Sequence, residues 1–206
     1  MKIYEDIGNK QNLHIIKNNY WKSQGIEVQR VPLPVADYIL GNEKIEDVIK
    51  RKAKRGMDLK KMDFLGTYNV AVDTKKDIGE LIGNVCGKQH ARFRDELILA
   101  LNNNIQLYIL VENRDRIRCI GELFTWHNPQ LDIMKNSEEV IGMTKGGFPK
   151  YRKVRKYPKA TTGERLAKAL FTMEGKYGCR FLFVSPEESG AKIIELLGVD
   201  NNGEAI

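Results

Sequence analysis

The most constraining feature of the sequence is an apolar run at residues 68–72 that ends in Asp73-Thr74-Lys75. A short apolar run of this kind predicts a buried strand. Because side chains alternate along a strand, Asp73 and Lys75 are expected on one face and Thr74 on the other. A second apolar segment, residues 35–40, carries a single acid, Asp37. Two acids and a lysine on adjacent strands suit a divalent-metal site that activates water, although a strand that merely ends in a solvated Asp and Lys also fits the triplet.

Composition narrows the class of protein. The 206 residues suit one domain with a substantial core. A net charge of +7 favours an anionic partner such as nucleic acid. The three cysteines are far apart and lack metal-ligand spacing, so we expect core thiols in a reducing compartment. His127 has no neighbouring His or Asp in the spacing of an HNH metal site, so we expect a packed or surface histidine.

The chain is expected in the cytoplasm, of a bacterium or of a phage-infected host cell. Its first residues contain no apolar segment of the kind found in secretory signals. No stretch approaches the 18 apolar residues that suggest a membrane span, so no membrane contact is expected.

Strand and helix patterns alternate along the chain. Strands are expected at residues 2–4, 26–31, 35–40, 68–75, 105–111 and 179–184. Helices are expected at residues 10–23, 43–54, 77–101 with a break at Gly87, 161–174 and 185–197. Residues 113–159 follow no clear pattern. The alternation predicts an α/β sheet covered on both faces.

In this order, the elements resemble the nuclease domain of the XPF family, a branch of the PD-(D/E)XK nucleases. The counterparts of the family motifs are Asp6, Ala36-Asp37-Tyr38, Asp73-Thr74-Lys75, Arg92-Phe93-Arg94-Asp95-Glu96 and Leu110-Val111-Glu112. The resemblance implies a three-layer α/β/α restriction-endonuclease-like core with a mixed central sheet. It implies one domain over residues 1–206, with insertions at 43–68 and 113–160.

Three departures from the family pattern stand out. Ala36 replaces the family glycine, and Asp73-Thr74-Lys75 replaces Glu-Arg-Lys. The first strand ends in Asp6-Ile7-Gly8-Asn9 instead of an Asp-Thr-Arg-Glu type sequence. Without the helix-hairpin-helix module of other members, the chain looks like a compact phage or mobile-element version.

The resemblance implies a role for each motif residue. Asp37 and Asp73 would hold Mg²⁺ or Mn²⁺ together with the backbone carbonyl of Thr74, and Lys75 would position the attacking water. Glu96 would assist the metal shell, and Arg92 would approach phosphate. A structural salt bridge at Asp37 and an i,i+4 surface pair between Arg92 and Glu96 remain the plainer alternatives.

Two basic segments are candidates for phosphate contact. The first segment, residues 50–55, belongs to the helix at 43–54, which we expect to lie beside the scissile phosphate; the second is residues 150–157. We expect both segments to bind DNA, and the plainer alternative is that both are solvated faces. Tyr151 and Tyr157 could also stack on unpaired bases. The candidate basic residues are Lys50, Arg51, Lys54, Arg55, Arg152, Lys153, Arg155 and Lys156.

The function expected from these observations is a Mg²⁺-dependent DNA endonuclease acting on phosphodiester bonds, with branched and single-stranded DNA both open as substrates. The alternatives are an inactive XPF-like DNA-binding or dimer-scaffold domain and an RNA-directed nuclease with the same core. A homodimer through the last helix–strand–helix is a further expectation, although the same apolar residues could be ordinary core. These residues are Leu166, Leu170, Met173, Ile193, Ile194 and Leu197.

Overall fold

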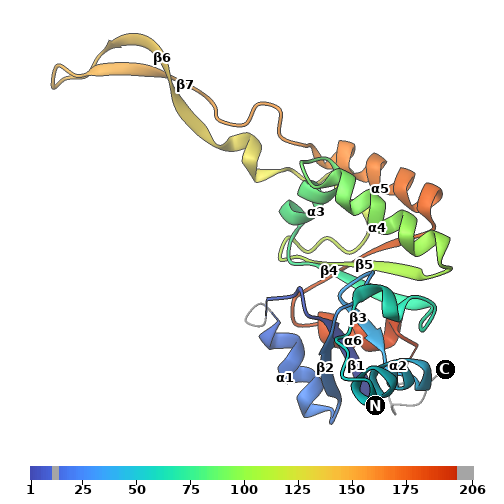
Figure 1. The fold of residues 1–206 in the computed structure, drawn as a ribbon. Coiled ribbons are helices and arrows are strands. Elements are labelled where there is room, and N and C mark those ends of the chain that lie inside the picture. The colour runs from blue at the N-terminus through green and yellow to red at the C-terminus, as the bar shows by residue number, and fades with distance from the viewer. Residues whose placement is uncertain (11–13, 199–206) are drawn as a thin grey trace.

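A six-stranded mixed sheet forms the centre of the protein in the computed structural model, which describes residues 1–10 and 14–198 (Figure 1). The strands are β1 (Lys2–Asp6), β2 (Glu27–Val31), β3 (Tyr38–Leu40), β4 (Val70–Lys75), β5 (Gln106–Glu112) and β8 (Arg180–Val184), in the order β2-β1-β3-β4-β5-β8. β3 is antiparallel to both of its neighbours, and the remaining pairs are parallel. The amino end of β3 therefore lies at the same edge of the sheet as the carboxyl ends of β1 and β4.

Helices cover both faces of the sheet, so the predicted three-layer α/β/α core is confirmed. α1 (Ile15–Ser23) and α6 (Ser189–Leu196) pack on one face, and Figure 1 shows α3, α4 and α5 on the other side of β4 and β5. The helices of that second layer are α2 (Glu43–Lys54), α3 (Ile78–Val85), α4 (His90–Asn102) and α5 (Gly163–Tyr177).

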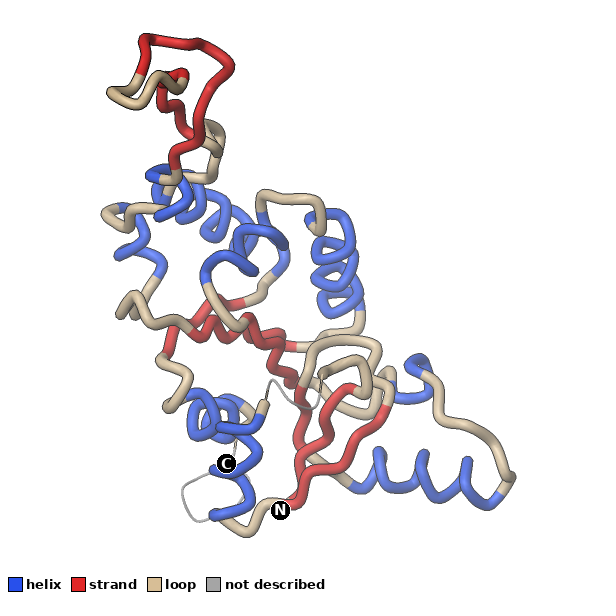
Figure 2. The backbone as a smooth tube through the Cα atoms, turned by 90° about the vertical axis from the view of Figure 1, so that its left-hand side faces the viewer, coloured by secondary structure: helices blue, strands red, loops and turns tan. Residues whose placement is uncertain are grey.

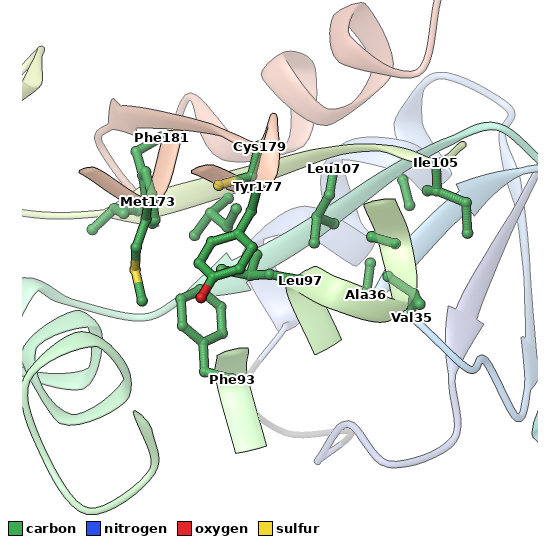
Figure 3. Packing of buried hydrophobic residues seen from close by; sticks show 14 of the residues in the cluster. Val35, Ala36, Phe93, Leu97, Ile105, Leu107, Met173, Tyr177, Cys179 and Phe181 are labelled. Atoms are coloured by element: carbon green, nitrogen blue, oxygen red, sulfur yellow. The ribbon is translucent and has the colours of Figure 1, made fainter. Parts of the chain in front are cut away.

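The larger core cluster fixes α4 and α5 against the sheet. Phe93 and Leu97 of α4 lie beside Tyr177 of α5 and Phe181 of β8 (Figure 3). The ring centroids of Phe93 and Phe181 are 6.5 Å apart. Each fully buried side chain of this size contributes about 1.5–3 kcal/mol to folding. This packing holds α4 at the height where its polar face can reach the edge of the sheet.

Most element boundaries follow the prediction, with four differences. The strand predicted at residues 35–40 is only β3, Tyr38–Leu40, because Ala36 has a φ of 67° and cannot continue a strand. The predicted break at Gly87 separates α3 from α4, and a Cβ there would lie 2.7 Å from the carbonyl oxygen of Gly83. α1 begins at Ile15 instead of residue 10, and residues 11–13 lie outside the described part of the chain. α6 begins at Ser189, because the backbone N–H of Ser185 donates to the side chain of Glu188 and residues 186–188 form a turn. α5 extends three residues beyond the predicted end, to Tyr177.

Residues 113–160, which show no clear pattern in the sequence, contain a separate two-stranded antiparallel ribbon. β6 (Met134–Met143) pairs with β7 (Pro149–Arg155), and neither strand joins the main sheet. Figures 1 and 2 show the ribbon extending away from the body of the molecule, beyond the layer of α3, α4 and α5. Short 3-10 turns at Ile120–Phe124 and Pro129–Asp132 precede it.

The expected dimer stripe belongs to the core of the chain itself. Leu166, Leu170 and Met173 of α5 are at most 5% exposed, and so are Ile193 and Leu197 on the other face. These side chains are therefore ordinary core, the alternative given above, and Ile194 is partly buried against the same core. The homodimer stays a prediction. Among the cysteines, Cys119 is exposed instead of buried. Within residues 1–10 and 14–198, no helix is both long and apolar enough to cross a membrane.

Candidate active site

Asp73 and Lys75 lie at the end of β4 as the alternation predicts. Both side chains are buried, each residue being 5% exposed, and they form an ion pair on the α4 side of the sheet. The ammonium nitrogen of Lys75 also lies 5.1 Å from the ring centroid of Phe93. Two charged side chains of this kind are buried only at a cost, which points to a role beyond packing.

Asp37 immediately precedes β3, whose residue Tyr38 pairs with Val72 of β4. Its carboxylate Oδ2 accepts hydrogen bonds from the backbone N–H of Thr74 at 2.8 Å and from the Thr74 hydroxyl at 2.6 Å. The neighbouring strands thus bring the two acids to one edge, although they are 36 positions apart. Thr74 contacts Asp37 through its N–H and hydroxyl.

Ala36 explains how the chain turns to place Asp37. Its φ is 67°, in the left-handed region that glycine adopts most easily. Glycine would satisfy this turn without strain, whereas Ala36 does so at a cost of about 1–2 kcal/mol. The backbone N–H of Ala36 donates to Glu96 Oε1 at 2.9 Å, so α4 holds the turn in place.

α4 presents a polar face to the same edge. One cavity is lined by residues of α4 that recur three or four positions apart and so share a face of the helix. They are Arg92, Asp95, Glu96 and Leu99. Glu96 bonds to Ala36, and within the described residues no ion pair joins it to Arg92. The i,i+4 surface pair considered for these two residues is therefore not what forms.

Asp6 and Lys61 complete the lining of the cavity and lie beside each other. Asp6 Oδ1 accepts from the Leu33 N–H at 2.9 Å, and its Oδ2 lies 3.5 Å from the Lys61 ammonium. Sequence reasoning did not single out Lys61, which returns to the site only after the excursion through α2. It also assigned no role to Asp95. No local pattern identifies either residue, although Lys61 follows Lys60 in a basic stretch of the predicted insertion.

The cavity has a volume of about 470 Å³ and is acidic in an otherwise basic chain. Five carboxylates and three basic side chains line it. Burial raises the pKa of Asp73 well above 3.8. The positive charge of Lys75 lowers this pKa, and the negative charges of Asp37 and Glu96 raise it further. Burial would lower the pKa of Lys75, but Asp73, Asp37 and Glu96 outweigh it and the pKa is raised. The Lys75 ammonium is thus paired with Asp73 and lies in the electrostatic field of Asp37 and Glu96.

This donor set fits a hard divalent cation in chemical type. Mg²⁺ and Mn²⁺ prefer carboxylate oxygens, and Asp73, whose Oδ2 meets the Lys75 ammonium, lines the cavity together with Asp37. Asp37 keeps a second carboxylate oxygen, since both donors from Thr74 meet the same atom. Within residues 1–10 and 14–198, no three His, Cys, Asp or Glu side chains already stand close enough together to hold a metal. Coordination by Asp37 and Asp73 would therefore need water or phosphate oxygens as further ligands.

The other sequence candidates lie away from the cavity. The basic residues of α2 do not line the cavity, whereas Lys61 from the same insertion does. Contact of α2 with DNA stays a prediction. The four basic candidates after residue 151 lie on or beside β7 in the ribbon. Glu112 forms a buried ion pair with Lys17 of α1. His127 is an exposed residue 2.8 Å from Asp132.

Comparisons with known proteins give a likeness in structure alone. No family model matches the chain, and no curated protein matches it. Among solved structures, XPF from Aeropyrum pernix in complex with DNA has a TM-score of 0.49 and 12% identity, over 95% of this chain and 62% of that one. The chain is similar in structure to XPF. A second structure of XPF from Aeropyrum pernix has a TM-score of 0.49 and 13% identity, over 100% of this chain and 65% of that one.

This chain spans less than two thirds of the length of either XPF structure. With identities this low, the comparison concerns the fold alone. The description of the site therefore rests on the strand order and on the cavity of the chain itself.

Proposed function

We propose that the protein is a metal-dependent endonuclease that hydrolyses phosphodiester bonds in DNA. The observation that carries the proposal is the meeting of Asp37, Asp73 and Lys75 in one acidic cavity. Carboxylates that share a buried lysine at the edge of a sheet suit hydrolysis of a phosphodiester by water. Strand alternation and the antiparallel pairing of β3 with β4 support this arrangement.

In the proposed site, Asp37 and Asp73 would hold Mg²⁺ or Mn²⁺, with the Thr74 carbonyl as a further ligand. The bound cation would supply charge stabilisation to the scissile phosphate and lower the pKa of a bound water. Lys75 orients the attacking water through its ammonium group, which Asp73 and the Phe93 ring hold in position. Glu96 fixes the Ala36 turn and so acts as a positioning residue.

The rim of the cavity would receive the nucleic acid backbone. Arg92 is exposed and lines the cavity, and Lys61 is 56% exposed at its side chain. Both side chains can therefore neutralise a phosphate that approaches the acids. The basic residues of α2 and its end would contact phosphates farther along the backbone; these are Lys50, Arg51, Lys54 and Arg55.

The test is cleavage of labelled single-stranded, duplex, flap and junction DNA, with RNA of matching sequence, in Mg²⁺ and in Mn²⁺. The proposal predicts cleavage of DNA that chelation abolishes. Cleavage of RNA alone would favour the RNA-directed alternative. DNA binding without cleavage of any substrate would favour an inactive scaffold. The observation that supports this alternative is Thr74, which stands where the XPF family pattern has an arginine.

A further inference from the structure

The β6–β7 ribbon and the residues next to it, 133–159, carry nearly all of the net charge of the chain. Residues 133–159 contain eight Lys and Arg residues and two Glu residues, a net charge of +6, whereas the whole chain carries +7. The rest of the chain is thus almost neutral. Such concentration of charge on one protruding element indicates a polyanionic partner for that element.

The ribbon has no partner within the described part of the chain. From Met134 to Arg155 every residue is exposed except Ser137 and Val154, which are partly buried. An isolated two-stranded ribbon is only marginally stable in water. Its exposed apolar side chains include Met143 at 69% and Phe148 at 72%, on either side of the turn at its tip. A surface that covers the ribbon would therefore stabilise it.

Basic side chains occur on both faces of the ribbon. Alternation along β7 places Lys153 and Arg155 on one face and Lys150 and Arg152 on the other. Arg152 is paired with Glu139 at 3.0 Å, and the structure gives the other three no ion pair within residues 1–10 and 14–198. A flat anionic surface would engage only one face. Two basic faces instead match a groove with a phosphate backbone on each side.

The dimensions of the ribbon agree with a duplex groove. The ten residues of β6 span at most about 33 Å at about 3.3 Å per residue. One turn of B-DNA is about 34 Å long, and its major groove is about 12 Å wide, enough for a two-stranded ribbon.

The two chain segments that carry the ribbon are joined to each other at its base, and the turn at Ile120–Phe124 packs against α5. The Lys156 N–H donates to the Ile133 carbonyl at 2.7 Å, and the buried Asn128 side chain donates to the Thr161 carbonyl at 2.8 Å. Next to Thr161, a Cβ on Gly163 would lie 2.1 Å from the Leu123 carbonyl oxygen, which shows how closely α5 and the preceding turn approach. A ribbon held in this way can set the direction of a bound DNA duplex relative to the cavity.

We propose that the β6–β7 ribbon lies in a groove of double-stranded DNA and that the site acts on a duplex, or on the duplex arm of a branched substrate. This inference rests on the proposed function for its link to cleavage. The ribbon residues do not line the cavity, so they contact the duplex away from the scissile bond. The exposed Phe148 at the tip meets the base edges, and Lys150, Lys153 and Arg155 meet the two backbones.

The test compares two fourfold alanine variants. The ribbon variant changes Lys150, Lys153, Arg155 and Lys156, and the control variant changes four exposed lysines elsewhere, Lys22, Lys44, Lys168 and Lys176. Binding to a 30-base-pair duplex and to a 30-nucleotide single strand is measured by fluorescence anisotropy in EDTA over a range of salt. The ribbon variant should lose at least about tenfold in duplex affinity, and its salt slope should fall by about three to four units, near 0.9 per phosphate contact. The control variant should match the wild type.

Several outcomes would overturn the inference. The inference fails if the ribbon variant binds the duplex as wild type does, or if its affinity for the single strand falls by the same factor. It also fails if the variant is impaired only in binding to phosphatidylserine vesicles or only in self-association measured by light scattering. A second variant, with residues 136–153 replaced by a short glycine turn, must also lose duplex affinity while its circular dichroism keeps the signal of the core. If either variant loses duplex affinity but wild type cleaves no substrate with metal, the proposed function fails and the ribbon inference stands.

Discussion

Thr74 donates both its N–H and its hydroxyl to one oxygen of Asp37, at 2.8 and 2.6 Å. The residue between Asp73 and Lys75 thus orients the other acid of the candidate site. Two donors on one carboxylate oxygen leave the other oxygen free to face the cavity. This relationship joins the end of β4 to the start of β3, and with it the two halves of the proposed metal site.

The first prediction concerns this contact. Thr74→Val keeps the shape and the N–H donor but removes the hydroxyl. Because the lost bond goes to a charged acceptor, the free energy of unfolding should fall by about 1–3 kcal/mol and cleavage should fall about tenfold or more. Thr74→Ser restores a hydroxyl and should recover most of both. Denaturant unfolding and single-turnover cleavage measure the two effects; equal activity of the Val and Ser variants would argue against an orienting role.

The second prediction concerns the turn at Ala36. Ala36→Gly relieves a left-handed conformation that costs alanine about 1–2 kcal/mol, but it adds about 0.4–1 kcal/mol of unfolded-state entropy. The variant should therefore be as stable as wild type or up to about 1.6 kcal/mol more stable. Ala36→Val should lose more than about 1 kcal/mol, since a β-branched residue is strained at positive φ. Chemical denaturation of both proteins measures this; a destabilised glycine variant would contradict the φ of 67°.

The elements of the sheet could be predicted because their burial imposes a period. Asp73 and Lys75 share a face since β4 is packed on both sides, and Gly87 breaks a helix that otherwise keeps its apolar stripe. The ribbon has no buried face and so no such period, and residues 113–160 could not be assigned. Lys61 was missed because its place depends on where the chain returns after α2. The start of α6 was misplaced because Ser185-Pro186 fits a turn as well as a helix start.

The third prediction concerns metal binding without catalysis. If Mn²⁺ binds with a dissociation constant of about 1 mM, then Mn²⁺ at about 10 mM raises the free energy of unfolding by about 1.4 kcal/mol. The melting temperature should then rise by about 3–5 °C. Asp73→Asn should lose most of this shift, whereas Asp47→Asn, an exposed acid on α2, should keep it. Thermal unfolding with and without Mn²⁺ provides the measurement. The same shift in both variants would place the metal elsewhere.

The fourth prediction concerns pH. The folded pKa of Asp73 is raised above 3.8, so the folded state holds the proton more tightly than the unfolded state. The contribution of Asp73 to stability is therefore fully present below its unfolded pKa and is lost as pH rises through its folded pKa. Without metal, the stability of wild type relative to Asp73→Asn should decline as pH rises from about 4. Unfolding curves at successive pH values test this; a difference that grows with pH would reverse the assignment.

The central claim is tested most directly by cleavage of a labelled DNA duplex in Mn²⁺ by wild type, Asp73→Asn and the matched control Asp47→Asn. Asp73→Asn keeps the shape of the side chain but removes its charge, so it should bind DNA in EDTA as well as wild type does. The account predicts rapid cleavage by wild type and by Asp47→Asn, and a rate at least about a hundredfold lower for Asp73→Asn, near 2.7 kcal/mol in barrier height. Cleavage by Asp73→Asn at the wild-type rate would contradict the account.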